Sequence, residues 1–153
     1  HVVLITTTII YEEDSMKLKI LEIGKMVPEF EPENIFVLFG QSSPPELREI
    51  SVIIDFKKND NVIYFREGSK LVISGKEYTI TEVGDLANLN FHELGHLSVY
   101  LNKDIEALPG AVHAIPDEFP RFKVGDEIEI IYWYRIIYNN VLKNIRLLVT
   151  YNK

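Results

Sequence analysis

The feature that most constrains the fold of this chain is the alternation of short β-prone runs with glycine and polar turns. Runs rich in Val, Ile, Tyr and Phe occupy residues 17–23, 35–39, 50–56, 62–65, 70–73, 77–81, 97–101 and 111–115. Many short strands separated by turn residues are typical of an all-β sandwich or barrel. We therefore expect an all-β fold, a small closed or partly closed barrel with one or two short helices.

Several local signals support this architecture. Ser74-Gly75 is a good two-residue hairpin turn between two of the runs. Asp85 is a candidate cap for a short helix that ends at Leu94, and Gly95 suits the left-handed exit from it. Residues 67–73 and 124–130 each place a Gly-polar turn directly before an alternating strand. The repeated pattern fits two strands of one barrel that each begin directly after a turn.

The N-terminal segment differs from the rest of the chain. Residues 1–15 precede Met16, and Glu12-Glu13-Asp14 must be encoded by a purine-rich stretch just ahead of the Met16 codon. Such a stretch stands where a bacterial ribosome-binding site would lie. We therefore hold two expectations open, that translation begins at Met16, or that the β-branched residues 2–10 form an extra strand.

The C-terminal segment is aromatic and β-prone up to the turn signal Asn139-Asn140. Beyond it, residues 141–151 have apolar spacing that suits either the second strand of a hairpin or a helix, and we favour the helix. The expected organisation is an N-terminal extension (residues 1–15), a main domain (16–131) and a C-terminal appendage (132–153).

Composition excludes several classes of function. The chain contains no cysteine, which excludes disulfides, thiol nucleophiles and Cys-ligated zinc and fits a reducing compartment. A net charge of -7 without a basic stripe disfavours nucleic-acid binding. No uncharged apolar run approaches the roughly 20 residues that a membrane span needs. We expect a soluble, cytoplasmic protein.

One motif suggests zinc chemistry. His92-Glu93-Leu94-Gly95-His96 has the H-E-x-x-H pattern, which on a helix places both histidines on one face with Glu93 as general base. A third ligand is not evident, and the β-prone residues after Gly95 indicate that the helix has ended. A small zinc metallopeptidase using His92 and His96 is therefore kept as a weak alternative, and we expect no metal.

A longer set of motifs points elsewhere. In order, the chain carries Ile23-Gly24, Leu38-Phe39-Gly40, Pro45-Glu46-Leu47, Tyr78-Thr79-Ile80-Thr81-x-Val83-Gly84, Ala87-Asn88-Leu89-Asn90, Glu93-Leu94-Gly95-His96, Leu108-Pro109-Gly110 and Val124-Gly125-Asp126. As an ordered set they resemble the glucitol/sorbitol-specific enzyme IIA component of the phosphoenolpyruvate-dependent sugar phosphotransferase system. The resemblance runs from Met16 to about Ile131.

The resemblance implies a mainly β, barrel-like fold and a phosphoryl-carrying function without a cofactor. Enzymes IIA of this type take a phosphoryl group on a histidine from the histidine phosphocarrier protein. They pass it to the IIB domain of a membrane permease (IIB/IIC). A neutral imidazole is a good nucleophile near pH 7. Partners of these kinds, and a cytoplasmic location next to a permease, follow as expectations.

The chain departs from the family at the phospho-acceptor. Counting from Pro45-Glu46-Leu47, the family's acceptor histidine falls on Ile54, which cannot be phosphorylated. His96 and His113 lie at motif positions, where the resemblance implies that they flank the phosphoryl site; each is alternatively a structural residue. The protein is then an inactive carrier or a non-catalytic binding or regulatory paralogue. If His96 or His113 lines the site, an Ile54→His variant is expected to take up phosphate slowly.

Overall fold

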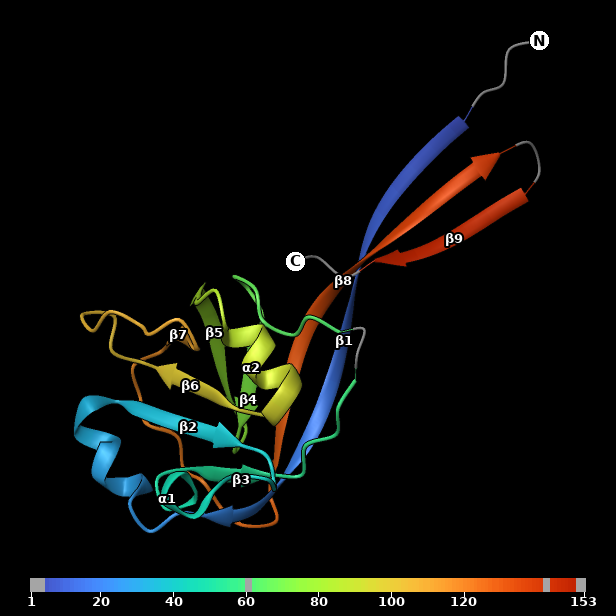
Figure 1. The fold of residues 1–153 in the computed structure, drawn as a ribbon. Coiled ribbons are helices and arrows are strands. Elements are labelled where there is room, and N and C mark those ends of the chain that lie inside the picture. Colours follow the sequence, from blue (N-terminus) through green and yellow to red (C-terminus); the bar gives the residue numbers. More distant parts are fainter. Residues whose placement is uncertain (1–4, 60–61, 142–143, 151–153) are drawn as a thin grey trace.

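Eight of the nine strands close into a barrel in the computed structural model, which describes residues 5–59, 62–141 and 144–150 (Figure 1). Their order is β1-β3-β2-β6-β7-β5-β4-β8, and pairing of β8 with β1 completes the circle. The strands are β1 (Ile5–Ile23), β2 (Ile35–Phe39), β3 (Val52–Ile54), β4 (Lys70–Ile73), β5 (Lys76–Val83), β6 (Leu97–Tyr100), β7 (Ala111–Ile115), β8 (Glu127–Val141) and β9 (Asn144–Thr150). The predicted all-β barrel is confirmed.

The helices are short and lie in the connections between strands. The 3-10 helix η1 spans Val27–Glu33, and the α-helices α1 and α2 span Pro45–Arg48 and Ala87–Leu94. Within the part of the chain that the structure describes, no helix is long and apolar enough to cross a membrane. The three short helices thus form part of the connections around the barrel.

Strand alternation builds the core. Because successive side chains point to opposite faces, alternate residues of each strand enter the barrel. Leu18, Ile20, Leu71, Ile73, Tyr78, Ile80, Ile128 and Ile130 are all at most 2% exposed. Phe91 of α2 joins them and contacts the rings of Phe56, Tyr64 and Phe65 at 4.9–5.5 Å. Burying each large apolar side chain stabilises the barrel by roughly 1.5–3 kcal/mol.

The two echoed segments of the sequence lie side by side. Strands β4 and β8, which they open, pair antiparallel. Gly68 and Gly125 have φ angles of 94° and 92°, which favour glycine. The N–H of Gly68 donates to the carbonyl of Ile80 at 2.8 Å, and the N–H of Gly125 donates to that of Ile20 at 2.9 Å. The barrel is thus built from two halves with the same backbone pattern.

The same pseudosymmetry holds where β1 and β5 end. The N–H of Gly24 donates to the carbonyl of Ser51 at 2.9 Å, and the N–H of Gly84 donates to that of Ala111 at 2.8 Å. Register shifts interrupt β1 between Ile20 and Glu22 and β5 at the equivalent step. In each half the strand therefore bends at a β-bulge, and a closely packed glycine follows the bulge.

Several local expectations are confirmed and others are wrong. Ser74 and Gly75 both have positive φ and form the predicted hairpin turn, and Gly95 ends α2 in the left-handed conformation. The N-cap of α2 is Leu86 rather than Asp85, without a side-chain cap. Residues 62–65 form no strand; Tyr64 and Phe65 instead reach the core from an irregular segment.

The helix expected after Asn139-Asn140 is wrong, because residues 144–150 form β9 and pair with β8 in the register Arg135↔Thr150 to Val141↔Asn144. Residues 151–153 lie outside the described residues. At the other end, β1 begins at Ile5, as the extra-strand expectation for residues 2–10 requires, although residues 2–4 lie outside the described residues. The start at Met16 and the division at residues 16 and 131 stay predictions.

Gly24 offers a test of the corner. A Cβ at Gly24 would overlap the carbonyl oxygens of Arg48 and Glu49, whereas a Cβ at Gly75 meets nothing within 4 Å. We expect Gly24→Ala to lower the free energy of unfolding by about 3 kcal/mol. Gly75→Ala, the control, should cost only about 1–2 kcal/mol for its left-handed backbone. Urea denaturation measures both, and equal losses would contradict the close approach at Gly24.

Candidate functional site

Ile54, which the sequence predicts to occupy the family's acceptor position, is the last residue of β3 and is fully buried, with 0% exposure. It pairs in register with Ile20 of β1, and its side chain belongs to the core of the barrel. The preceding residue, Ile53, pairs with Phe39 of β2. A side chain at position 54 with this backbone therefore enters the barrel and does not face a partner protein.

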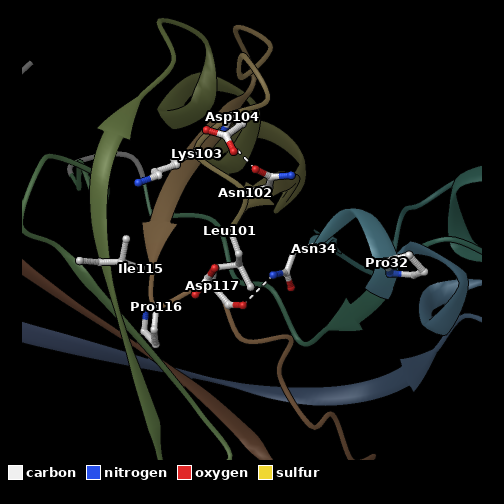
Figure 2. Close-up of a pocket in the computed structure, with 9 residues that line it drawn as sticks. All are labelled: Pro32, Asn34, Leu101, Asn102, Lys103, Asp104, Ile115, Pro116 and Asp117. Carbon is white, nitrogen blue, oxygen red and sulfur yellow. Dashed lines mark hydrogen bonds between the residues drawn. The ribbon is translucent and has the colours of Figure 1, made fainter.

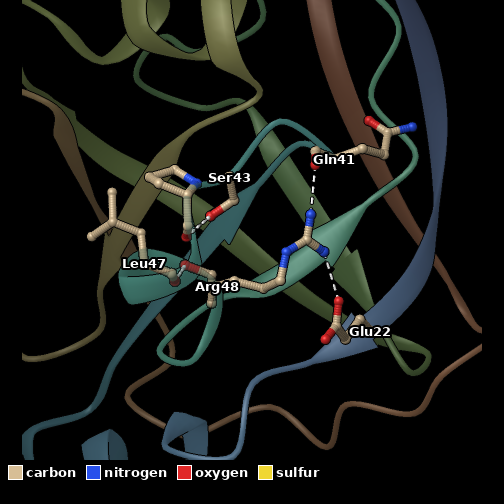
Figure 3. Close-up of polar contacts among 7 residues, drawn as sticks. Glu22, Gln41, Ser43, Leu47 and Arg48 are labelled. Atoms are coloured by element: carbon tan, nitrogen blue, oxygen red, sulfur yellow. Dashed lines mark hydrogen bonds and ion pairs between the residues drawn. The ribbon is translucent and has the colours of Figure 1, made fainter.

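A polar network begins immediately after Ile54. The side-chain amide of Gln41 donates from Nε2 to Oδ1 of Asp55 at 2.9 Å, and its Oε1 accepts from the N–H of Phe56 at 3.2 Å. Arg48 of α1 donates from Nη2 to the carbonyl of Gln41 at 2.5 Å and from Nη1 to Oε2 of Glu22 at 2.6 Å (Figure 3). The network links β1, the loop after β2, α1 and the end of β3.

Two leucines with exposed side chains have their backbones next to residues of this network. Leu47 of α1 is 38% exposed and Leu94 at the end of α2 is 43% exposed. The carbonyl of Leu94 accepts a hydrogen bond from the N–H of Gly40 at 3.1 Å, which brings the end of α2 to the loop after β2. Gly40 and Gly95 are required here, because a Cβ on either would lie 2.7 Å from a neighbouring atom. The surface therefore combines exposed apolar side chains with hydrogen-bonded polar groups.

His96 lies beside this surface, just beyond Gly95. Its ring stacks at a tilt on Phe39, with 4.7 Å between centroids, and its Nδ1 lies 3.4 Å from the carbonyl oxygen of Leu38. Burial lowers the pKa of the His96 imidazole below its ordinary value, and the Leu38 carbonyl offsets part of this effect. The imidazole is therefore neutral at pH 7. Because a carbonyl only accepts, this contact places the proton on Nδ1 and the lone pair on Nε2.

His113 is held differently. It lies on β7 and is 8% exposed, with Nε2 2.7 Å from the carbonyl oxygen of Ile105 and Nδ1 3.2 Å from Oε2 of Glu82. Its ring also contacts Tyr100 edge to face. Both ring nitrogens face oxygen atoms of the protein, so those oxygens occupy the directions from which a phosphorus atom would approach either nitrogen.

The structure does not bring the two motif histidines together around position 54. His96 adjoins the Leu38–Phe39 end of β2, whereas Tyr100, the ring neighbour of His113, pairs with Ile35 at the other end of that strand. Among the described residues, the hydrogen-bond partner of His96 is Leu38, and those of His113 are Glu82 and Ile105. The expectation that both flank one phosphoryl site stays a prediction without geometric support.

The zinc hypothesis requires a helix that carries both His92 and His96, and α2 does not extend that far. His92 belongs to α2, but the helix ends at Leu94 and Gly95 turns left-handed before His96. Nδ1 of His92 lies 3.1 Å from Oε1 of Glu93, whose other oxygen accepts from Nζ of Lys58 at 3.1 Å. The bond from Lys58 lowers the pKa of Glu93, and His92 adds to this effect. Across residues 5–59, 62–141 and 144–150, no group of three or more His, Asp or Glu side chains is placed to hold a metal ion.

A hollow of about 360 Å³ lies elsewhere on the barrel (Figure 2). It is lined by Pro32, Asn34, Leu101, Asn102, Lys103, Asp104, Ile115, Pro116 and Asp117. Within it, Nδ2 of Asn34 donates to the carbonyl of Asp117 at 2.7 Å. None of the site residues predicted from the sequence lines this hollow, so it does not explain their motifs.

Comparisons with known proteins agree with the motif order. The sequence model of the family described as the glucitol/sorbitol-specific IIA component of the PTS system matches residues 15–129. Among solved structures, the chain is similar to a PTS system IIA component from Enterococcus faecalis V583, with 29% identity and a TM-score of 0.65. That likeness covers 76% of this chain and 98% of the other. A comparison with curated proteins found no match.

The network of Gln41, Arg48 and Glu22 was not predicted from the sequence. Its bonds join residues 14 and 26 positions apart, and no local motif marks them. Only the Pro45-Glu46-Leu47 turn signalled that α1 lies near the acceptor position.

The lowered pKa of His96 has a measurable consequence. An NMR titration of the imidazole should give a pKa below the ordinary value of about 6.5. Since the unfolded chain then binds the proton more readily, the free energy of unfolding should fall as the pH drops below about 6.5. His96→Gln should weaken this dependence, and His92→Gln is the control. A His96 pKa at or above 6.5 would contradict the burial argument.

Proposed function

The chain belongs to the family of glucitol/sorbitol-specific IIA components of the phosphotransferase system, and we propose that it binds phosphotransferase proteins without accepting a phosphoryl group. The observation that carries this proposal is Ile54, a hydrocarbon side chain with 0% exposure at the family's acceptor position. It offers no lone pair, and the carboxylate of the next residue, Asp55, is already hydrogen-bonded to Gln41.

The surface beside Ile54 supports a binding role. Leu47 directly precedes Arg48, and the carbonyl of Leu94 accepts from the N–H of Gly40, directly before Gln41. The side chains of both leucines are exposed. Apolar side chains surrounded by polar groups are typical of protein–protein interfaces. Family membership supports the histidine phosphocarrier protein and the IIB domain of a permease as the partners proposed for this surface. We propose that the protein acts in the cytoplasm, next to the membrane permease.

One observation favours a second candidate, phosphoryl transfer through His96. Its imidazole is neutral, and within the described residues no hydrogen bond to Nε2 is found. Nε2 would attack the phosphorus atom of the phosphorylated phosphocarrier, the phosphorus–nitrogen bond to that donor would break, and the group would rest on His96. The proton on Nδ1 would stay directed at the Leu38 carbonyl throughout. His113 does not offer this arrangement, because both of its nitrogens face acceptors.

Phosphoryl uptake from labelled phosphoenolpyruvate, enzyme I and the phosphocarrier separates the two candidates. We expect no acid-labile phosphate on the wild-type chain. The sequence alone predicted slow uptake by Ile54→His, but the burial of position 54 changes that expectation to none. Label on the wild type that is lost in His96→Gln and kept in His113→Gln would refute the first candidate and establish the second.

Binding to the partner tests the surface itself. Leu47→Asp should weaken binding to the phosphocarrier or to the IIB domain about tenfold, or about 1.4 kcal/mol, because it places a charge in the apolar part of the interface. Leu108→Asp is the matched control, since Leu108 is 64% exposed on the other pseudosymmetric half. Calorimetric titration measures both. Equal losses of affinity for the two variants, or no loss for Leu47→Asp, would show that the interface lies elsewhere.

A further inference from the structure

The hollow shown in Figure 2 lies between two loops whose counterparts in the other half of the barrel are joined by a polar bridge. Parallel strands pair alike in the two halves, β2 with β3 and β6 with β7, in the registers Phe39↔Ile53 and Tyr100↔His113. Two residues beyond each pair, Gln41 of the first half corresponds to Asn102 of the second. By the same count, Asp55 corresponds to Ile115. Asn102 and Ile115 both line the hollow.

The second half lacks the groups that form this bridge. In the first half, Gln41 donates to the carboxylate of Asp55 and accepts from the N–H of Phe56. In the second half, Ile115 has no polar side-chain atom, and Pro116 has no N–H to donate. The bridge therefore cannot form, and a hollow of about 360 Å³ lies in its place.

Several polar groups of the hollow remain available to a ligand. Oδ1 of Asn102 accepts from the N–H of Asp104 at 3.0 Å, and Nδ2 of Asn34 donates to a backbone carbonyl. Among the residues that the structure describes, the side chains of Lys103, Asp104 and Asp117 form no hydrogen bond or ion pair. Lys103 and Asp104 lie at one end of the hollow (Figure 2). Asn34 and Asp117 lie at the other end, so a molecule that spans the hollow meets polar groups at both.

The charges of the hollow favour a neutral ligand. An anion meets the two carboxylates of Asp104 and Asp117, and a cation meets the ammonium group of Lys103, so each faces a charge of its own sign. Within the described residues, no group of three or more His, Asp or Glu side chains is placed to hold a metal ion. A purely apolar compound would take these charged groups out of water without giving them partners, which is costly. The ligand that fits is therefore neutral and polar.

We propose that the hollow binds a small neutral compound with several hydroxyl groups, a monosaccharide or an open-chain polyol. A hydroxyl group both donates and accepts, so one such molecule can donate to the carboxylates and accept from Lys103. Ile115 is 52% exposed, and with Pro116 it offers an apolar surface to the C–H groups of the compound.

The size of the hollow limits the ligand further. Its volume of about 360 Å³ is near the lower end of the range of about 300–1,000 Å³ for ligand pockets, which suits a single sugar unit. This inference is independent of the proposed function, because the hollow lies in the other half of the barrel and its ligand needs no partner protein.

An NMR titration of the full chain tests the site directly. Glucose, which is a ring, and mannitol, which is an open chain, are added separately. For at least one of them we expect saturable shifts of the amide signals of residues 101–104 and 115, and the compound that binds identifies the kind of ligand. Asp117→Ala should weaken this binding at least about tenfold, because it removes a charged acceptor of hydroxyl groups.

Asp85→Ala is the matched control for this titration, since Asp85 is exposed and does not line the hollow. It should bind as tightly as the wild type. The absence of a saturable shift with either compound overturns the proposal, and so does equal binding by Asp117→Ala and the wild type. Saturation by inorganic phosphate alone would make the hollow an anion site and would also overturn it.

Rebuilding the bridge of the first half is the second arm of the experiment. The double variant Asn102→Gln with Ile115→Asp places at the hollow the two kinds of side chain that join the corresponding loops. We expect it to lose the binding while its melting temperature stays close to that of the wild type, since Ile115 is exposed. Undiminished binding by the folded double variant would show that the compound binds outside the hollow and would overturn the proposal. The Asp117→Ala comparison decides on its own if the double variant fails to fold.

Discussion

The hydrogen bonding between β1 and β8 is the interaction on which the rest of the fold depends. It joins the first and last strands of the barrel in one unbroken antiparallel ladder from Lys19↔Glu127 outward. Without it, both strands would become open edges, and the core residues Leu18 and Ile130 would lose their cover. Because the ladder continues past the barrel, the same interaction that closes the core also joins residues 5–14 of β1 to residues 132–141 of β8.

The two halves of the barrel share a backbone pattern but differ in the side chains that it carries. Glu22 and Glu82 follow equivalent bulges in β1 and β5. Glu22 pairs with Arg48, which also holds the loop at Gln41, whereas Glu82 faces His113. The two bends are thus alike, but the polar groups beside them differ, since in the first half Arg48 and Gln41 form a network that reaches Asp55, the residue after Ile54. Function is therefore a property of side chains placed on a repeated scaffold.

Sequence predicted the fold better than the site. Turn residues act locally, so they could be recognised in the sequence. Ser74-Gly75 predicted the hairpin turn, and Gly95 predicted the end of the helix. The apolar spacing after Asn140 fits helix and strand equally, and pairing with β8 decides between them. The partners of Arg48 come from β1 and from the loop after β2, so that network depends on the closed barrel and was invisible in the sequence.

The burial of position 54 determines which side chains the core of the barrel can accept there. Ile54 fills the barrel with hydrocarbon, and a fully buried aliphatic side chain contributes roughly 1.5–3 kcal/mol. A histidine in the same place must satisfy its ring nitrogens inside the core or be turned out of it by a shift of β3, since an unpaired buried polar group costs about 1–3 kcal/mol. An acceptor at this position therefore works against the packing, and isoleucine removes that conflict. The side chains of Leu47 and Leu94 are exposed and lie outside that core. Under the proposed function, partner binding therefore does not depend on which side chain fills position 54.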